Sequence, residues 1–342
     1  MRKIAGILLL CIIFSFSFKD EPACATASLR QKASFPVGTA INTEKLKYEE
    51  RYWETALAEF NSFTPEKVMK PAFIHPEKDR FDFSETDQLV KFCFENKIRL
   101  HGHTLLWHKA EPHWLDDFEG NAEDWEQLMK THIQTIVSRY KGQVKSWDVV
   151  NEAFNDDGSL RKTIWLKNIG PSYIEKAFFY AAEADPEALL FYNDYSLEHL
   201  SAKLDAVLDY LNGMRAAGVA VHGLGMQMHV GLYFPPAETI NTSAARIAAE
   251  GFVVHYSELD VNLEEAPLFS SRKKINILQK DRVKAIVSGF MQLSARQRFG
   301  ITLWGVSDND SWLMEESVRS RPLLFDKRYR QKPAYCGFLE AL

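Results

Sequence analysis

Short apolar runs alternate with longer amphipathic segments from about residue 36 to the end of the chain. The short runs have the length and the β-branched and aromatic content that are typical of buried strands. We predict eight strands, at residues 36–41, 59–64, 98–104, 144–150, 189–194, 222–228, 252–260 and 300–308. In the longer segments apolar residues recur every three or four positions, which predicts helices at residues 85–97, 128–142, 173–184, 203–218 and 282–297.

This alternation predicts an α/β fold, a single-domain (β/α)8 TIM barrel over residues 28–342. Such barrels need ~250 residues plus insertions, and the chain has room for them. A doubly wound open sheet is the alternative, and it usually has a glycine-rich phosphate loop after its first strand. Neither "GTAINTE" nor "GHTLLWH" is such a loop, and we find no internal repeat and no linker.

The first residues resemble an export signal. "MRKIAGILLLCIIFSFSF" has a basic start and an apolar run that is short for a bilayer span. Ala25, Thr26 and Ala27 fit a small-residue cleavage site, so we predict a signal peptide over residues 1–27 and a secreted or periplasmic protein. An uncleaved anchor and a lipid on Cys24 remain alternatives.

Four cysteines do not make a disulfide framework in a chain of this size. We expect Cys11 and Cys24 to leave with the signal peptide, and Cys93 and Cys336 to be buried and unpaired. The sequence contains no CxxC or HExxH pattern, so we expect no metal.

The formal net charge is −5, and acidic and basic residues are mixed along the whole chain. Without a basic stripe, nucleic acid is not an expected partner. We expect a monomer that has no membrane span once the signal peptide is removed.

Polar and aromatic residues gather where the predicted strands end. In a barrel these ends meet at one face, which is where active sites lie. The residues in question are Glu66, Lys70, His103, Trp107, His108, Asn151, Glu152, Asn193, Asp194, Gln227, His229, Glu258, Asp260, Trp304 and Trp312. Any single one has an ordinary structural explanation, such as a capped loop, but their accumulation at seven strand ends favours a functional site.

Two of these residues, Glu152 and Glu258, suggest glycoside hydrolysis. This reaction needs one carboxylic acid to protonate the leaving oxygen and a second carboxylate to attack the sugar or to activate water. The alternative for each glutamate is an ion pair with a nearby lysine or arginine. For a retaining enzyme we expect the two carboxyl groups to lie about 5 Å apart. The mechanism requires no cofactor.

The neighbours of the two glutamates suggest their roles. Asp260 lies two residues beyond Glu258 on the same strand, and His229 could bridge the two carboxylates and keep Glu258 ionised as a nucleophile. Apolar surroundings and the charge of Glu258 would raise the pKa of Glu152, which suits a general acid. Asn151 could donate a hydrogen bond to a sugar 2-hydroxyl.

At these positions the chain resembles glycoside hydrolase family 10, the retaining endo-β-1,4-xylanases. The resemblance extends from about residue 30 to the end, in the motifs "GHTLLWH", "WDVVNEAF", "YNDYS", "GMQMH", "SELDV", "LWGVSDNDSW", "PLLFD" and "KPAY". It implies that Glu152 is the acid/base, that Glu258 is the nucleophile, and that xylan or xylo-oligosaccharides are the substrate. It also implies a set of sugar-binding residues in the two subsites on the non-reducing side of the cut: Glu66, Lys70, His103, Trp107, Asn151, Gln227, Trp304 and Trp312.

The sequence departs from the family pattern at two neighbouring places. Lys67 and Pro71 stand where the family usually has Asn and Trp, and Lys109 and Ala110 stand where Ser and Gln are expected. By resemblance, the missing Asn and Gln belong to the second non-reducing subsite. We hypothesise that this subsite accepts a decorated xylose, with Lys67 and Lys109 meeting a uronic acid. Alternatively, both lysines are solvated and the subsite is simply weaker.

Two rival functions remain at this point. One is another retaining β-glycanase that acts on cellulose or mixed-linkage glucan. The other is a non-catalytic carbohydrate-binding relative, which would normally have lost one of the two carboxylates, whereas both are present here.

Overall fold

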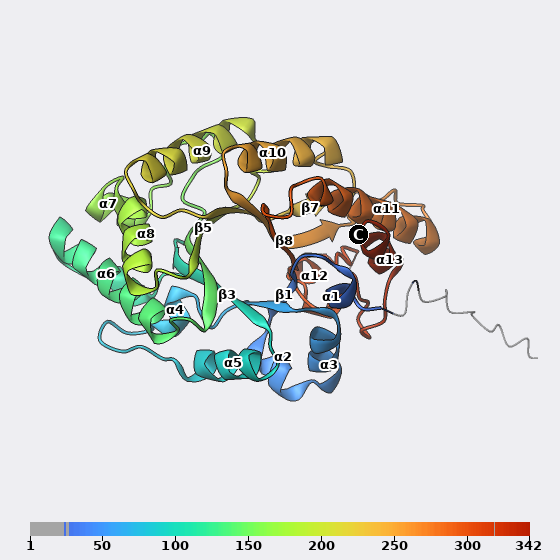
Figure 1. The fold of residues 1–342 in the computed structure, drawn as a ribbon. Coiled ribbons are helices and arrows are strands. Elements are labelled where there is room, and N and C mark those ends of the chain that lie inside the picture. Colours follow the sequence, from blue (N-terminus) through green and yellow to red (C-terminus); the bar gives the residue numbers. More distant parts are fainter. Residues whose placement is uncertain (1–23, 25–26, 318) are drawn as a thin grey trace, which may run out of the picture.

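The structure is a computed structural model that describes residue 24, residues 27–317 and residues 319–342, and it confirms the predicted barrel (Figure 1). Eight parallel strands close into a ring, because β9 pairs with β1 and β6 pairs with β8. They are β1 (Val37–Ile41), β2 (Ser62–Pro65), β3 (Arg99–Trp107), β4 (Val144–Asn151), β5 (Leu189–Asp194), β6 (Gly223–Met226), β8 (Val253–Asn262) and β9 (Arg298–Leu303).

All eight predicted strands are present, and several of them end at other residues than predicted; the eighth run, for example, was expected to extend to residue 308, but β9 stops at Leu303. The sixth run was expected to extend to residue 228, but β6 stops at Met226. Met228 adopts a φ of +67°, which interrupts the extended chain. A further short strand, β7 (His229–Gly231), then pairs with the last part of β8 and brings His229 opposite Asp260.

A ring of helices surrounds the strands (Figure 1). Its longer members are α3 (Glu50–Glu59), α5 (Ser84–Glu95), α6 (Ala122–Arg139), α8 (Tyr173–Ala184), α9 (Ser201–Ala216), α10 (Ala237–Ala249) and α11 (Arg272–Met291). The shorter helices are α1 (Leu29–Lys32), α2 (Thr43–Tyr48), α4 (Pro71–Ile74), α7 (Ile164–Ile169), α12 (Leu313–Glu316), α13 (Pro333–Glu340) and the 3-10 turns η1 (His113–Leu115) and η2 (Asp308–Asp310).

The cysteine prediction is wrong for Cys336, which was expected to be unpaired. Cys24 forms a disulfide with Cys336 in α13, so in this structure Cys336 is paired and the Cys24 thiol is not free for a lipid. The pairing was missed because the two cysteines are 312 positions apart, and the closure of the barrel brings both ends of the chain together. Cys93 is buried and unpaired, as expected.

The predicted signal peptide lies almost entirely outside the described residues and stays a prediction. No helix in the described part of the chain is both long and apolar enough to cross a membrane.

Candidate active site

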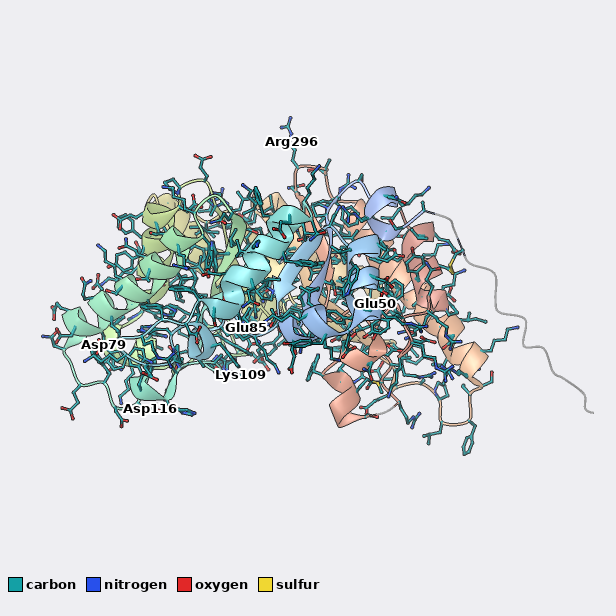
Figure 2. All side chains as sticks on the ribbon, turned by 90° about the horizontal axis from the view of Figure 1, so that it is seen from below. Glu50, Asp79, Glu85, Lys109, Asp116 and Arg296 are labelled. Atoms are coloured by element: carbon teal, nitrogen blue, oxygen red, sulfur yellow. A yellow bond between two sulfur atoms is a disulfide. The ribbon has the colours of Figure 1, made fainter. Side chains whose placement is uncertain are left out.

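The polar strand-end residues gather at one end of the barrel. In Figure 2 Lys109, which follows β3, lies along the lower edge of the molecule, and Arg296, which precedes β9, lies at the opposite edge. The lower edge therefore carries the carboxyl ends of the strands, where a barrel usually has its active site. Glu152 and Glu258 reach this end from β4 and β8.

Glu152 follows the last residue of β4 and has an unusual backbone. Its φ is +57°, in the left-handed region that a residue with a Cβ seldom adopts. Its N–H donates to the Asn193 carbonyl (2.9 Å) and its carbonyl accepts from Arg161 Nε (2.9 Å). In a regular strand consecutive side chains point to opposite faces. The turned backbone at residue 152 releases the chain from that alternation just where Asn151 and Glu152 meet the opening.

The Glu152 carboxylate has one partner on each oxygen. Gln227 Nε2 donates to Oε1 at 3.1 Å, and Lys109 Nζ forms an ion pair with Oε2 at 3.4 Å. The Glu152 side chain is 5% exposed, whereas that of Lys109 is 58% exposed. The acid group is therefore held from the inside by an amide and from the solvent side by an ammonium group.

Glu258 is buried near the middle of β8 and is held differently. Its Oε1 accepts a hydrogen bond from Asn193 Nδ2 at 2.8 Å, and its Oε2 lies 3.4 Å from His229 Nε2. Ser257 Oγ donates to Asn193 Oδ1 at 2.6 Å and so fixes the orientation of that amide. These contacts hold the Glu258 carboxylate in a defined position.

Asn193 and Gln227 join the two carboxylates. The backbone of Asn193 accepts from Glu152 while its side chain donates to Glu258. Gln227 does the reverse, because its side chain donates to Glu152 and its backbone carbonyl accepts from the Glu258 N–H (2.9 Å). Both carboxylates therefore lie in the same opening. Their predicted separation of about 5 Å stays a prediction.

His229 bridges Glu258 and Asp260. Its Nδ1 lies 2.9 Å from Asp260 Oδ2, which also accepts from Trp312 Nε1 at 3.0 Å. Burial alone would lower the pKa of His229. The two carboxylates outweigh burial and raise its pKa well above the usual value. The imidazole is thus positively charged at neutral pH and stabilises the charge on Glu258.

The pKa predicted for Glu152 is wrong in direction. Burial does raise it, but the hydrogen bond from Gln227 and the positive charge of Lys109 outweigh burial, so the pKa of Glu152 lies below its usual value. The prediction missed this because Lys109 is 43 positions away (152 − 109) and reaches the glutamate only through the turn after β3. In the free protein Glu152 is ionised at neutral pH.

Most of the residues that resemblance assigned to sugar binding surround this pair. Lys70 Nζ lies 4.5 Å from the centre of the Trp107 ring and 5.9 Å from that of Trp304. Burial lowers the pKa of Lys70, while Glu258, Glu66 and Glu152 oppose that shift. With its amide oxygen facing Trp107, Asn151 accepts from the indole Nε1 at 3.2 Å.

His103 forms the inner wall beneath these residues. Its Nδ1 lies 2.9 Å from Asp148 Oδ2, and its ring packs edge-on to Trp304. It is 2% exposed, so at most one edge of the ring reaches the opening.

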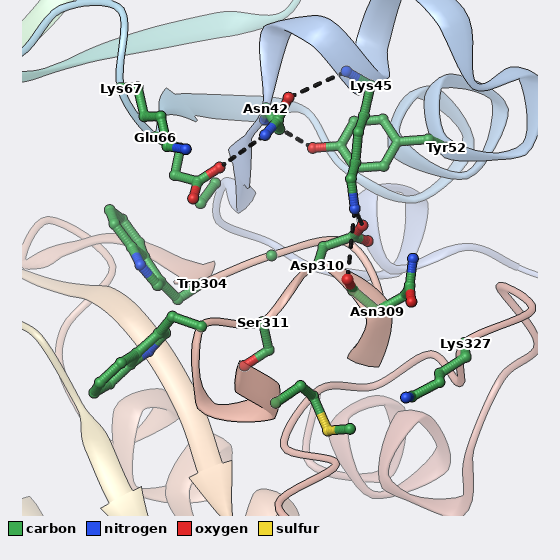
Figure 3. A pocket seen from close by; sticks show the side chains of 14 residues that line it. Asn42, Lys45, Tyr52, Glu66, Lys67, Trp304, Asn309, Asp310, Ser311 and Lys327 are labelled. Atoms are coloured by element: carbon green, nitrogen blue, oxygen red, sulfur yellow. Dashed lines mark hydrogen bonds and ion pairs between the residues drawn. The ribbon is translucent and has the colours of Figure 1, made fainter. Parts of the chain in front are cut away.

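A hollow of about 340 Å³ lies beside Trp304, and neither Glu152 nor Glu258 lines it (Figure 3). Trp304 and Trp312 line it, and the Trp312 ring also packs against the His229 ring, with 5.2 Å between ring centres. Glu66 and Lys67 form the opposite side, where Asn42 Nδ2 donates to Glu66 Oε2 at 3.4 Å. This volume falls in the range of ligand pockets, and the two indoles offer flat apolar faces.

The two unusual lysines occupy different places. Lys67 is exposed and lines the hollow, and its predicted role in the second non-reducing subsite stays a prediction. Lys109 does not line it and instead pairs with Glu152, and its predicted contact with a uronic acid stays a prediction. The hollow also contains residues that the sequence analysis missed: Asn42, Lys45, Tyr52, Asn309, Asp310 and Lys327. Lys45 and Asp310 form an ion pair at 2.7 Å; Asp310 lies within the motif "LWGVSDNDSW", but no motif contains Lys45.

The described residues contain no cluster of three or more His, Cys, Asp or Glu side chains that could hold a metal ion.

Comparison with known proteins gives a consistent family. The family model described as "Glycosyl hydrolase family 10" matches residues 26–341. The chain is 35% identical over 347 residues to endo-1,4-beta-xylanase B of Thermotoga neapolitana, covering 100% of this chain and 98% of that protein. It is 38% identical over 327 residues to endo-1,4-beta-xylanase A of Xylanibacter ruminicola, covering 87% and 88%.

Solved structures agree with these matches. Native xylanase 10B from Thermotoga maritima has a TM-score of 0.86 at 38% identity, covering 92% of this chain and 98% of that one. Xylanase 10B from Thermotoga petrophila RKU-1, solved in complex with xylobiose, has a TM-score of 0.87 at 38% identity, covering 93% and 97%.

Proposed function

Because the chain belongs to glycosyl hydrolase family 10, we propose that it is an endo-1,4-β-xylanase that cuts internal bonds of xylan with retention of configuration. The chain is a glycoside hydrolase, and the observation that carries the finer proposal is the pair of buried carboxylates. Glu152 and Glu258 share the partners Asn193 and Gln227, yet one carboxylate meets an exposed lysine and the other a partly buried, charged histidine. The structure of a relative with xylobiose supports a xylose-based substrate.

The proposed reaction has two steps. In the first, a Glu258 oxygen attacks the anomeric carbon while protonated Glu152 donates its proton to the departing glycosidic oxygen. A covalent glycosyl ester forms as the sugar–oxygen bond breaks. In the second step, ionised Glu152 removes a proton from water, the water oxygen attacks the same carbon, and the bond to Glu258 breaks.

The surrounding residues position the sugar in this scheme. Lys70, Gln227 and Asn151 present donors beside the carboxylates, while Trp304 and Trp312 stack against the rings on the non-reducing side. His229 and Asp260 act through Glu258, because His229 contacts both carboxylates and holds that of Glu258 in place.

The hollow also supports a preference for decorated xylan at the second non-reducing subsite. Lys67 and Lys327 both line it, and no ion pair of either is found in the described residues. Lys45 is different, because Asp310 neutralises it. Two cations without a partner beside stacking indoles suit a sugar that carries a uronic acid carboxylate.

Product analysis tests both proposals together. The protein should release short oligosaccharides from glucuronoxylan and from unsubstituted xylan. In Lys67→Ala, the acidic oligosaccharides released from glucuronoxylan should be longer or less abundant than those from wild type. The neutral oligosaccharides should be unchanged. If the acidic products of Lys67→Ala match those of wild type, the lysine is merely solvated and the subsite proposal fails.

Replacing Glu258 with glutamine separates the enzyme from its rivals. Glutamine keeps the size of the side chain but cannot form the glycosyl ester, so hydrolysis should fall by at least ~10³-fold while xylo-oligosaccharide binding persists. A non-catalytic binder would show no activity even as wild type. A cellulose or mixed-linkage glucanase would release more reducing sugar from carboxymethyl cellulose than from xylan.

We also propose that the protein is exported. The basic and apolar start of the chain supports this, and so does the Cys24–Cys336 disulfide, because disulfides persist mainly in oxidising compartments. N-terminal sequencing of the secreted protein would test it, and it would also show whether cleavage spares Cys24.

A further inference from the structure

Lys109 stands in the turn that follows β3, where the family pattern has a small polar residue. From there its ammonium group reaches the carboxylate of Glu152, with 3.4 Å between Nζ and Oε2. Its stem passes Trp107, and Nζ lies 5.8 Å from the centre of that ring. Figure 2 shows Lys109 at the edge of the molecule that carries the strand ends.

The two oxygens of Glu152 differ in their partners. Gln227 donates a hydrogen bond to Oε1, whereas Oε2 is buried and accepts no hydrogen bond in the described part of the structure. The Lys109 ion pair therefore supplies a charge attraction to Oε2, in addition to the Trp107 side chain, which also lowers the pKa of Glu152. A buried carboxylate oxygen without a partner is unfavourable, so removing this cation should change the state of the carboxylate.

We propose that Lys109 is a positioning residue that holds the acid/base carboxylate of Glu152 oriented and ionised between turnovers. This inference rests on the proposed function, in which Glu152 acts first as an acid and then as a base. Lys109 opposes the first role, which needs a protonated carboxyl group. It supports the second role, which needs an ionised one.

Other charged groups face Glu152 from the neighbouring elements. They are Lys70 after β2, His108 after β3, Arg161 after β4, Asp194 of β5 and Glu258 of β8.

None of these groups replaces Lys109. Burial lowers the pKa of His108 to about 4, so it is neutral at the working pH. Arg161 Nε binds the backbone carbonyl of Glu152, and Lys70 lies over Trp107. Burial raises the pKa of Asp194 to about 6 against the opposing charge of Lys203, and both Asp194 and Glu258 favour the protonated form of Glu152.

The sign of the expected effect follows from charge. Removing the Lys109 cation destabilises ionised Glu152 and raises its pKa. The general acid then stays protonated to higher pH, so the alkaline limb of kcat/KM moves upward. The general base also needs a higher pH to ionise, so the acidic limb of the second step moves in the same direction.

The experiment compares pH profiles of kcat/KM on a soluble xylo-oligosaccharide for wild type, Lys109→Met, Lys109→Gln and Lys109→Arg. The alkaline limb of the profile should move to higher pH by roughly 0.5–1 pH unit in the Met and Gln variants. The shift should be modest because Lys109 is partly solvated, which weakens its attraction to Glu152. Lys109→Arg keeps the charge and should follow wild type. Lys141→Met, at the amino end of β4, removes the same charge far from the opening and should also follow wild type.

An aryl xylobioside with an acidic phenol adds a second measurement. Its leaving group departs without a proton, so its turnover depends on Glu152 as the base. The acidic limb of the pH profile of kcat should move to higher pH in Lys109→Met and should stay at the wild-type pH in Lys109→Arg. Profiles of the Met and Gln variants that coincide with wild type would overturn the inference. Wild type without xylanase activity would overturn the proposed function instead.

Discussion

His229 carries a positive charge because two carboxylates face its two ring nitrogens. Asp260 lies at Nδ1 and Glu258 at Nε2, and together they raise the pKa of His229 well above its usual value despite burial. The attraction between the charged imidazole and these carboxylates therefore also stabilises the folded protein.

This raised pKa makes stability depend on pH in a definite direction. The contribution of His229 is fully present below its unfolded pKa of about 6.5 and is lost as the pH rises toward the folded value. In that window, the difference in free energy of unfolding between wild type and His229→Asn should shrink by about 1.4 kcal/mol per pH unit.

Urea unfolding at about pH 5.5, 7.5 and 9.5 measures this difference. Replacing the exposed His113 with asparagine provides the control and should give no such trend. A difference that stays constant across the three pH values would mean that His229 is not charged in the folded protein.

At the scale of single residues, the sequence predicted positions better than ionisation states. The contact of His229 with Glu258 and Asp260 could be predicted because two neighbouring strand ends carry these residues. The lowered pKa of Glu152 could not, because it depends on where the Lys109 turn folds. Arg161 was also missed, since its contact is to a backbone carbonyl and leaves no motif.

A glycine in β6, Gly225, makes room for the β5 side chain that orients Glu258. A Cβ placed on Gly225 would lie 2.1 Å from Oδ1 of Asn193. The side-chain amide of Asn193 donates the hydrogen bond that holds Glu258. Real Cβ atoms cannot approach that closely, so Gly225 leaves the space that the Asn193 side chain occupies. Two adjacent strands thus orient a carboxylate on a third.

Replacing Gly225 with alanine should therefore impair activity beyond its effect on stability. We expect a loss of about 1–3 kcal/mol in free energy of unfolding from overpacking. We also expect kcat/KM to fall by at least ~10-fold, because Asn193 must move away from Glu258.

Gly213→Ala is the matched control. Gly213 lies in α9, and a Cβ there would meet nothing within 4 Å. It should be neutral or raise stability by about 0.5–1 kcal/mol, with unchanged kinetics. Thermal unfolding and steady-state rates on xylan distinguish the two variants. If Gly225→Ala retains full activity, Asn193 does not orient Glu258.

At the scale of elements, buried strands were predictable because they are nearly continuous apolar runs. Helix α10 was not predicted, because its buried face consists of Ile240, Ser243, Ala244, Ile247 and Ala248, and small or polar residues give weak periodicity. The predicted helix at 282–297 began ten residues late (282 − 272), since α11 starts in the basic stretch "RKKIN". The short β7 depends on its pairing with β8 and has no signal of its own.

Across the whole molecule, two connections join the beginning of the chain to its end. Strand β1 pairs with β9 to complete the barrel, and the disulfide links residue 24 to α13. The number of strand–helix units allowed the first connection to be predicted. The second could not be predicted, because cysteine spacing does not determine pairing and Cys24 was assigned to the signal peptide.

If the mature protein keeps Cys24, replacing Cys336 with serine should lower its free energy of unfolding by about 2–5 kcal/mol. The cross-link restricts the unfolded chain over 312 positions, so its loss increases the entropy of that state. Reductant should lower the melting temperature of wild type and leave Cys336→Ser unaffected.

Mass spectrometry of non-reduced peptides identifies the Cys24–Cys336 link directly. A wild type whose melting temperature is insensitive to reductant would contradict the link in the mature protein. That result would instead support cleavage after Ala27.

Because the backbone at Glu152 is left-handed, the residue that best suits stability at position 152 differs from the residue that activity requires. Glycine adopts that conformation without steric penalty. It also has no carboxylate that must be buried and paired with Lys109 and Gln227. A mutant library selected for survival at high temperature alone would therefore accumulate glycine at position 152 and yield sturdy but inert proteins. Selection for a more durable biocatalyst from this scaffold has to screen for sugar release in every round.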